Sequence, residues 1–200
     1  MNFASNVFSN RSDLTTAVDL WINDPTTALN TYGHISYWDV SAITDFSSLF
    51  EATWENPFNF NSDISNWDVS SGTDFNRMFY RAEAFNQDIS RWDVSSGTDF
   101  NRMFFNAEAF NQNIGDWDVS SGTDFSYMFA RADTFNQDIG IWDVSSGTGF
   151  SYMFQSADAF NQDIGDWDVS SGIDFRRMFS QTDVFNQDIG SWDVSSGTYF

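Results

Sequence analysis

Aspartates that recur at a fixed interval are the residues of this sequence best suited to chemistry. In six successive segments of equal length, one aspartate stands between a tryptophan and a valine. These residues are Asp68, Asp93, Asp118, Asp143, Asp168 and Asp193. If the segments stack, their carboxylates lie about 5 Å apart, the distance between neighbouring strands, and repel one another.

Two arrangements would offset that repulsion. Carboxylate and carbonyl oxygens in such a row could bind Ca²⁺, which would make these six aspartates metal ligands. Alternatively, each aspartate accepts hydrogen bonds from the serine and glycine amides that follow it, which is a purely structural use. The sequence leaves both open, and Ca²⁺ is the only cofactor that it suggests.

The same row offers little for catalysis. Acid and base roles require two carboxylates in different environments, whereas a uniform row gives every carboxylate the same surroundings. The one histidine, His34, is expected to be a turn residue. The chain has no cysteine, which excludes thiolate nucleophiles and disulfides. We therefore expect a protein that is not an enzyme.

Positions that change from one segment to the next are candidates for binding a partner. One such column contains arginine or tyrosine in every segment, and both residue types are common in the energetic centres of interfaces. The column consists of Arg77, Arg102, Tyr127, Tyr152 and Arg177. These side chains could contact a partner, or they could simply stack on one another as a solvated ladder.

Stacked elements must position these columns, because a period of about 25 residues is typical of solenoid proteins. Within a segment, Ile89, Trp92 and Val94 follow the spacing of a leucine-rich repeat and predict a short strand. From Phe100 the apolar spacing changes to three and four, which predicts a short helix or 3₁₀ turn. The predicted fold class is an α/β repeat solenoid that is leucine-rich-repeat-like, with one parallel β-strand per repeat.

Two domains are expected. Residues 1–33 are not repetitive and predict a helical N-terminal cap, with Ser12 or Asp13 as the helix cap. Residues 34–200 form the repeat solenoid, with about seven repeats, the last of them incomplete. A four-residue insertion is expected around residues 54–57, because the first two Trp-Asp-Val segments are further apart than all the later ones.

The sequence of the repeats resembles that of a known family. The segment Phe135-Asn-Gln-Asp-Ile-Gly-Ile-Trp-Asp-Val-Ser-Ser-Gly-Thr is similar to the repeat of Mycoplasma lipoproteins and BspA-like bacterial surface proteins. The lead-in segments at residues 14–22 and 32–41 are also similar to the entry into such arrays. The resemblance implies a leucine-rich-repeat-like fold, an extracellular or cell-surface location and a role in adhesion. It brings no catalytic residues.

Net charge limits the partners. The formal charge is −21, with 29 acidic and 8 basic residues, so nucleic acid and anionic membranes are expected to be repelled. No stretch is apolar enough to predict membrane insertion. The remaining partners are a protein or glycan surface, or further copies of the chain placed end to end.

The last segment suggests how copies could meet. Trp192 and Phe200 would leave apolar surface exposed at that end of the stack and are therefore predicted to form an assembly surface. Together these observations predict a non-catalytic surface scaffold for adhesion or protein binding. One alternative is a structural subunit that stacks into a filament or surface layer. A lesser alternative is a calcium-binding aspartate module.

Overall fold

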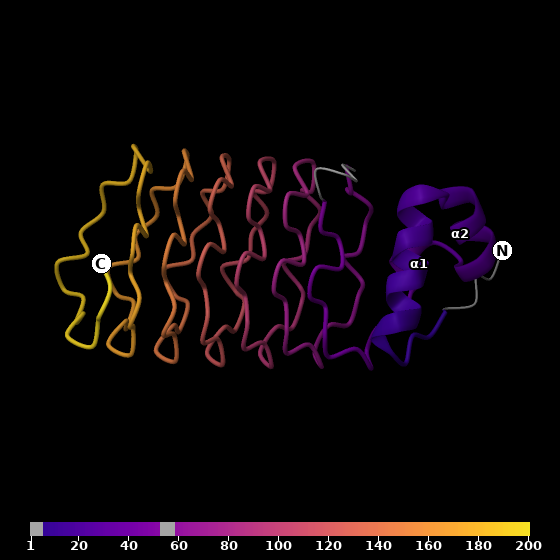
Figure 1. Ribbon diagram of the computed structural model, residues 1–200, viewed down its shortest axis with the longest axis horizontal. Helices are drawn as coiled ribbons and strands as arrows, with labels where there is room; N and C mark the ends of the chain where they lie inside the picture. The colour runs from indigo at the N-terminus through magenta and orange to yellow at the C-terminus, as the bar shows by residue number, and fades with distance from the viewer. Residues whose placement is uncertain (1–5, 53–58) are drawn as a thin grey trace.

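The computed structural model describes residues 6–52 and 59–200, which form an elongated molecule (Figure 1). Helices α1 (Arg11–Asn23) and α2 (Pro25–Tyr32) lie at one end, and a row of similar coils extends from them to the C-terminus. A 3₁₀ helix, η1 (Ile35–Tyr37), leads into the first coil. The insertion expected around residues 54–57 lies outside the described residues.

Helix α1 begins earlier than the predicted caps allow. The side chain of Asn10 accepts a hydrogen bond from the amide of Asp13 at 2.9 Å, so Asn10 is the N-cap. Leu14, Ala17 and Val18 lie on one face of α1 and are buried. Asp24 ends α1 and caps α2 by accepting a hydrogen bond from the amide of Thr27.

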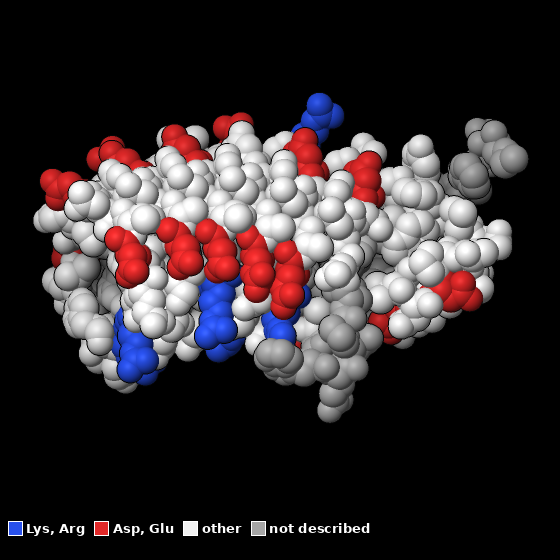
Figure 2. Space-filling view, turned by 90° about the horizontal axis from the view of Figure 1, so that it is seen from above, with Lys and Arg blue, Asp and Glu red and all other residues white. Residues whose placement is uncertain are grey.

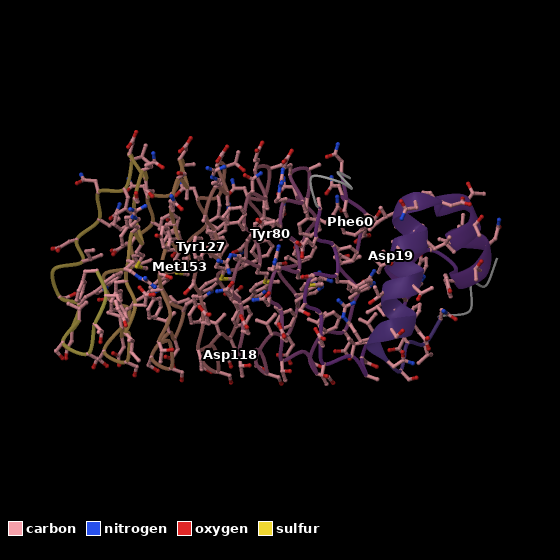
Figure 3. The ribbon with its side chains drawn as sticks, viewed as in Figure 1. Asp19, Phe60, Tyr80, Asp118, Tyr127 and Met153 are labelled. Carbon is pink, nitrogen blue, oxygen red and sulfur yellow. The ribbon has the colours of Figure 1, made fainter. Side chains whose placement is uncertain are left out.

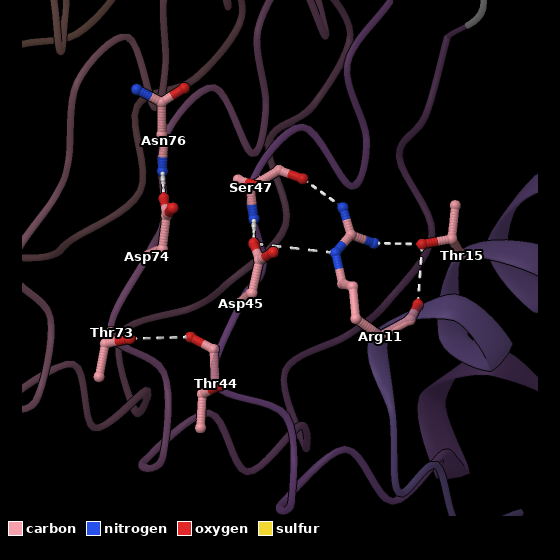
Figure 4. A network of polar contacts seen from close by, with 8 residues as sticks. All are labelled: Arg11, Thr15, Thr44, Asp45, Ser47, Thr73, Asp74 and Asn76. Atoms are coloured by element: carbon pink, nitrogen blue, oxygen red, sulfur yellow. Dashed lines mark hydrogen bonds and ion pairs between the residues drawn. The ribbon is translucent and has the colours of Figure 1, made fainter.

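An arginine on α1 joins the helices to the first coil (Figure 4). The guanidinium of Arg11 donates a hydrogen bond to the carbonyl of Ser47 and lies 3.8 Å from Oδ1 of Asp45. The chain before α1 also pairs with this coil, because the amide of Phe8 donates to the carbonyl of Asp39 at 2.9 Å. The helices are therefore held against the stack by polar contacts and by the common core.

The predicted strand is wrong, and with it the α/β leucine-rich-repeat-like fold class. The described residues contain no β-strand and therefore no sheet. At the predicted strand, the amide of Trp92 donates to the carbonyl of Ile89, and the amide of Gly97 donates to that of Val94. These local turns occupy backbone groups that a strand would offer to its neighbours. Isolated parallel bridges join the coils instead, at residues such as Asp74 and Asp99.

The predicted short helix or 3₁₀ turn in each repeat is also wrong, because positive φ angles at residues such as Arg102 and Asn106 interrupt both. Residues 101–106 form turns, in which successive amides alternate between two kinds of acceptor. The amides of Arg102 and Phe104 donate to carbonyls of the next coil, whereas the amide of Met103 donates to Phe100 within its own coil. A helix would direct every amide along its own axis. Alternation instead joins each coil to the next without a strand.

Aromatic columns fill the interior of the stack. Phe79 stacks on Phe104 at a centroid distance of 5.5 Å with an angle of 5° between the rings, and the same contact recurs along the chain. Each buried tryptophan of the later coils donates from Nε1 to an isoleucine carbonyl of the coil before it, as Trp117 does to Ile89. In the column of Phe100 and Phe125, a glycine three residues earlier leaves room for the ring: a Cβ on Gly122 would lie 2.4 Å from Cζ of Phe125.

Candidate functional site

The outward row of aspartates is used for local hydrogen bonds. Oδ1 of Asp143 accepts from the amide of Ser145 at 3.0 Å and from its hydroxyl at 2.6 Å. The amide contact recurs at all six predicted positions. These bonds, the hydroxyl first and then the amide, lower the pKa of Asp118 and Asp168. The structural use that the sequence left open is therefore present.

The contacts of the described residues give no support to the hypothesis that the outward row binds calcium. Within residues 6–52 and 59–200, no group of three or more histidine, cysteine, aspartate or glutamate side chains is arranged to hold a metal ion. The six aspartates lie in one row as expected, but each carboxylate accepts from the serine of its own coil. Calcium binding by this row stays a prediction.

A second row of aspartates, which is more buried, was missed by the sequence reasoning. Asp74, Asp99 and Asp124 occupy successive coils at the parallel bridges and are half-buried. Burial, followed by the charges of Asp124 and Asp74, raises the pKa of Asp99. Gly149 interrupts the row, and a Cβ there would lie 2.6 Å from Oδ1 of Asp124. The repeat period alone could have revealed this row.

The predicted partner-binding column has an unusual backbone. Arg77, Arg102, Tyr127, Tyr152 and Arg177 all have positive φ angles, between 53° and 60°. Residues other than glycine, asparagine and aspartate rarely adopt this conformation, which costs about 1–2 kcal/mol per residue. The coil demands the conformation at this position, and yet none of these five coils uses glycine there.

Side chains of this column stack, as the alternative interpretation expected. The guanidinium of Arg77 lies 4.3 Å from the ring centroid of Tyr80, which also stacks on Phe105 at 4.8 Å. Tyr127 stacks on Tyr152 at 4.4 Å, with an angle of 5° between the rings. Figure 3 places Tyr80 and Tyr127 midway across the stack and Asp118 at its edge, so the two columns lie on different faces.

Beside this column lies a groove of about 470 Å³ that the sequence reasoning missed. Figure 2 shows acidic side chains in a row along the stack, with arginines beside them. The groove is lined by Tyr80, Arg81, Glu83, Phe105, Asn106, Glu108 and Arg131. Its signal in the sequence is the period: Glu83 and Glu108 are one repeat apart and therefore occupy the same place in successive coils.

The predicted assembly residues lie at the last coil. Phe200 is 72% exposed, and Trp192 donates from Nε1 to the carbonyl of Ile164 at 3.0 Å. They border an apolar hollow of about 330 Å³ together with Phe175, Met178, Phe179, Ile189 and Val194. In earlier coils the equivalent tryptophans and phenylalanines are buried.

A further hollow, of about 560 Å³, lies at the first coil. Its polar wall includes Asp68 of the outward row and Asp39, the equivalent residue of the first coil, and Tyr37 contributes an exposed ring. Oδ1 of Asp39 accepts from the amide and hydroxyl of Ser41, as in later coils. This hollow therefore contains the same local turns as the rest of the row.

Comparisons with known proteins identify a family but not an activity. A family model described as "Mycoplasma protein of unknown function, DUF285" matches residues 5–140 and 114–200. No curated protein and no solved structure matches the chain. Among the described residues, none of the helices combines the length and the apolar character that crossing a bilayer requires.

Proposed function

The chain belongs to the DUF285 family of Mycoplasma repeat proteins, and from this premise we propose that it is a non-catalytic scaffold that binds a protein or glycan surface. We place it outside the cell or on the cell surface, because its repeats resemble those of BspA-like surface proteins. The location rests on the resemblance between the repeat sequences.

One observation carries this proposal: a uniform backbone presents a column of changing arginine and tyrosine side chains. Arg77, Arg102 and Arg177 share this column with tyrosines, at positive-φ positions where glycine would be less strained. Stacking holds these side chains in place, since the guanidinium of Arg102 lies 4.3 Å from the ring centroid of Tyr127. Side chains that are already ordered lose less conformational entropy when a partner binds.

Replacing the three arginines tests the proposal. We expect the triple variant Arg77→Ala, Arg102→Ala and Arg177→Ala to bind about tenfold more weakly, because arginine often dominates interface energies. The measurement is attachment of protein-coated beads to wells coated with collagen, mucin or cellulose. The matched control is the triple variant Asp93→Asn, Asp118→Asn and Asp143→Asn, which changes three coils on the other face.

Circular dichroism would show that both triple variants remain folded. Equal attachment by the arginine variant and the wild type, on every surface to which the wild type attaches, would exclude this column as the binding surface. A wild-type chain that attaches to none of the coatings would count against the scaffold itself.

A further inference from the structure

We propose that the groove beside the arginine and tyrosine column binds a linear, uncharged glycan that lies along the axis of the stack. The inference rests on the proposed function and names the ligand class of that face. The groove is bounded by the seven residues given above, and the glycan would chiefly contact Tyr80, Glu83, Phe105, Asn106 and Glu108.

A hydrogen-bond network holds the polar floor of the groove. Nδ2 of Asn106 donates to Oε1 of Glu83 at 3.3 Å and to Oε1 of Glu108 at 3.2 Å. Nη2 of Arg81 lies 3.8 Å from Oε1 of Glu83, and the arginine side chain is only 13% exposed. The two carboxylates are therefore positioned before any ligand binds.

The acceptors of this floor favour a ligand with hydroxyl groups. Asn106 uses Oε1 of both Glu83 and Glu108, and the second oxygen of each carboxylate accepts no hydrogen bond from another described residue. Both glutamates are exposed, which makes those oxygens accessible. Neighbouring sugar units carry hydroxyl donors at regular intervals and would satisfy one carboxylate per unit.

Charge in the groove argues against an ionic ligand. Arg81 and Arg131 balance Glu83 and Glu108, so the lining carries no formal net charge. An anionic polymer would meet the field of a chain with net charge −21, and a cationic one would compete with the arginines for the carboxylates. An uncharged polyol avoids both costs.

Aromatic edges give the groove an apolar wall. Tyr80 and Phe105 stack at 4.8 Å with 9° between their rings, and both are partly exposed. Phe105 covers a face of Tyr80, and the guanidinium of Arg77 also lies over that ring, so Tyr80 offers chiefly its edge to a ligand. The C–H groups of a pyranose ring can pack against such edges while its hydroxyl groups donate to the glutamates.

The period of the stack fits a polymer rather than a single sugar. Successive coils are about 5 Å apart, the spacing of hydrogen-bonded neighbours, and one hexose unit of a linear glycan has a similar length. Glu83 and Glu108 occupy equivalent places in two successive coils, whose Tyr80 and Phe105 rings stack at 4.8 Å. Arg81, Asn106 and Arg131 repeat beside them, and all three have φ angles between 56° and 59° without being glycine.

Isothermal titration calorimetry of the whole chain with cellohexaose, maltohexaose and chitohexaose tests this inference. We expect at least one hexasaccharide to bind with saturation, and its disaccharide to bind more weakly. Glu108→Gln should weaken binding about tenfold, because it removes the charge from one acceptor while preserving its size. Asp118→Asn, in the outward row on the other face, is the matched control and should bind like the wild type.

The outcomes separate this inference from the proposed function. Absence of binding to all three hexasaccharides, or binding that Glu108→Gln does not change, would overturn the glycan groove. If the chain still attaches to protein-coated wells through the arginine column, the scaffold stands and only the ligand class is wrong. A thermal melt of Glu108→Gln that matches the wild type would show that any loss of binding is local.

Discussion

The two lateral faces of the stack use the same backbone period in different ways. On one face, Asp93 and its equivalents repeat without change, and each accepts hydrogen bonds from the serine two residues later. On the other face, the equivalent position holds an arginine at Arg102 and a tyrosine at Tyr127 and Tyr152, while the φ angle stays between 56° and 60°. One face repeats a side chain because the turn needs it. The other repeats only a backbone conformation.

This difference indicates where function can reside. A column whose side chain closes a turn in every coil cannot vary without a cost in stability. A column in which only the backbone is fixed can carry any side chain that tolerates the conformation. A side chain that repeats without change along a repeat protein is therefore more readily explained by a structural role. The columns whose side chains vary are the better candidates for binding.

The largest expected effect comes from removing the core that both faces share. Phe129 is fully buried and lies 4.0 Å from Phe135 between ring centroids, and 5.7 Å from Phe104. Phe129→Ala should reduce the free energy of unfolding by about 3–5 kcal/mol, through lost burial and a cavity. Urea denaturation followed by tryptophan fluorescence measures this change.

Ile141→Ala provides the control for that variant. Ile141 is 79% exposed, so its replacement should leave the urea midpoint nearly unchanged. A Phe129→Ala chain as stable as Ile141→Ala would mean that the coils do not depend on the stacked rings. Both lateral faces would then need another source of order.

A smaller effect distinguishes the two faces directly. Asp143→Ala removes two hydrogen bonds with Ser145 and should destabilise the fold by about 1 kcal/mol, as loss of a helix cap does. Arg177→Ala removes a side chain whose guanidinium lies 5.9 Å from the ring of Tyr152 and should change stability by less than about 0.5 kcal/mol. Thermal melts of the two variants, recorded together, give the comparison.

The reverse order would contradict the division between a structural and a variable face. If Arg177→Ala proved the more destabilising variant, the arginine and tyrosine column would be part of the framework. Its role as a binding surface would then lose its main support.

Much of the core could be predicted from the sequence, because the period fixes which residues occupy equivalent places. Trp92, Val94, Phe100 and Phe104 belong to the repeating apolar positions, and all four are buried. The strand could not be predicted correctly from Trp92 and Val94, because a spacing of two describes which residues face inward and not where their amides bond. The aspartate between them, which accepts from Ser95, is the local signal for a turn that competes with a strand.

The groove was harder to predict, since its residues are distant in sequence and lie outside the Trp-Asp-Val motif. Asn106 donates to Glu83 of the preceding coil, and this contact depends on the lateral offset between coils. Positive φ angles at residues such as Arg81 also have no signal in the sequence, because glycine is absent there. Side-chain identity therefore predicted the regular face better than the irregular one.

The contributions of the outward and the half-buried aspartates to stability should depend on pH in opposite directions. Hydrogen bonds from Ser120, its hydroxyl first, lower the pKa of Asp118 in the outward row. Its contribution to stability is therefore present above the pKa of about 4 in the unfolded chain and is lost as pH falls through its folded pKa. Burial raises the pKa of Asp99, so its contribution is present below about pH 4 and is lost as pH rises through its folded pKa.

Asp99→Asn tests this opposition, because the amide oxygen of the new side chain can still accept the hydrogen bond that the amide of Asn101 donates at 2.8 Å. The variant should melt at a higher temperature than the wild type at pH 7, and the advantage should shrink below about pH 4, where wild-type Asp99 is protonated. Asp118→Asn should show the opposite trend and be less stable than the wild type at pH 7. Equal melting temperatures for Asp99→Asn and the wild type across this pH range would remove the distinction.

Calcium should have the smallest effect, and the reason lies in how the regular face uses its oxygens. Each outward carboxylate already accepts on Oδ1 from the serine amide of its own turn, as Asp93 does from Ser95 at 3.1 Å. A Ca²⁺ ion needs six to eight oxygens, so one carboxylate per coil would have to be joined by several carbonyls or waters. We therefore expect the melting temperature to be the same in Ca²⁺ and in EDTA. A melting temperature that falls by several degrees in EDTA for the wild type, but not for Asp118→Asn, would contradict this expectation. The invariant face would then be a cation site.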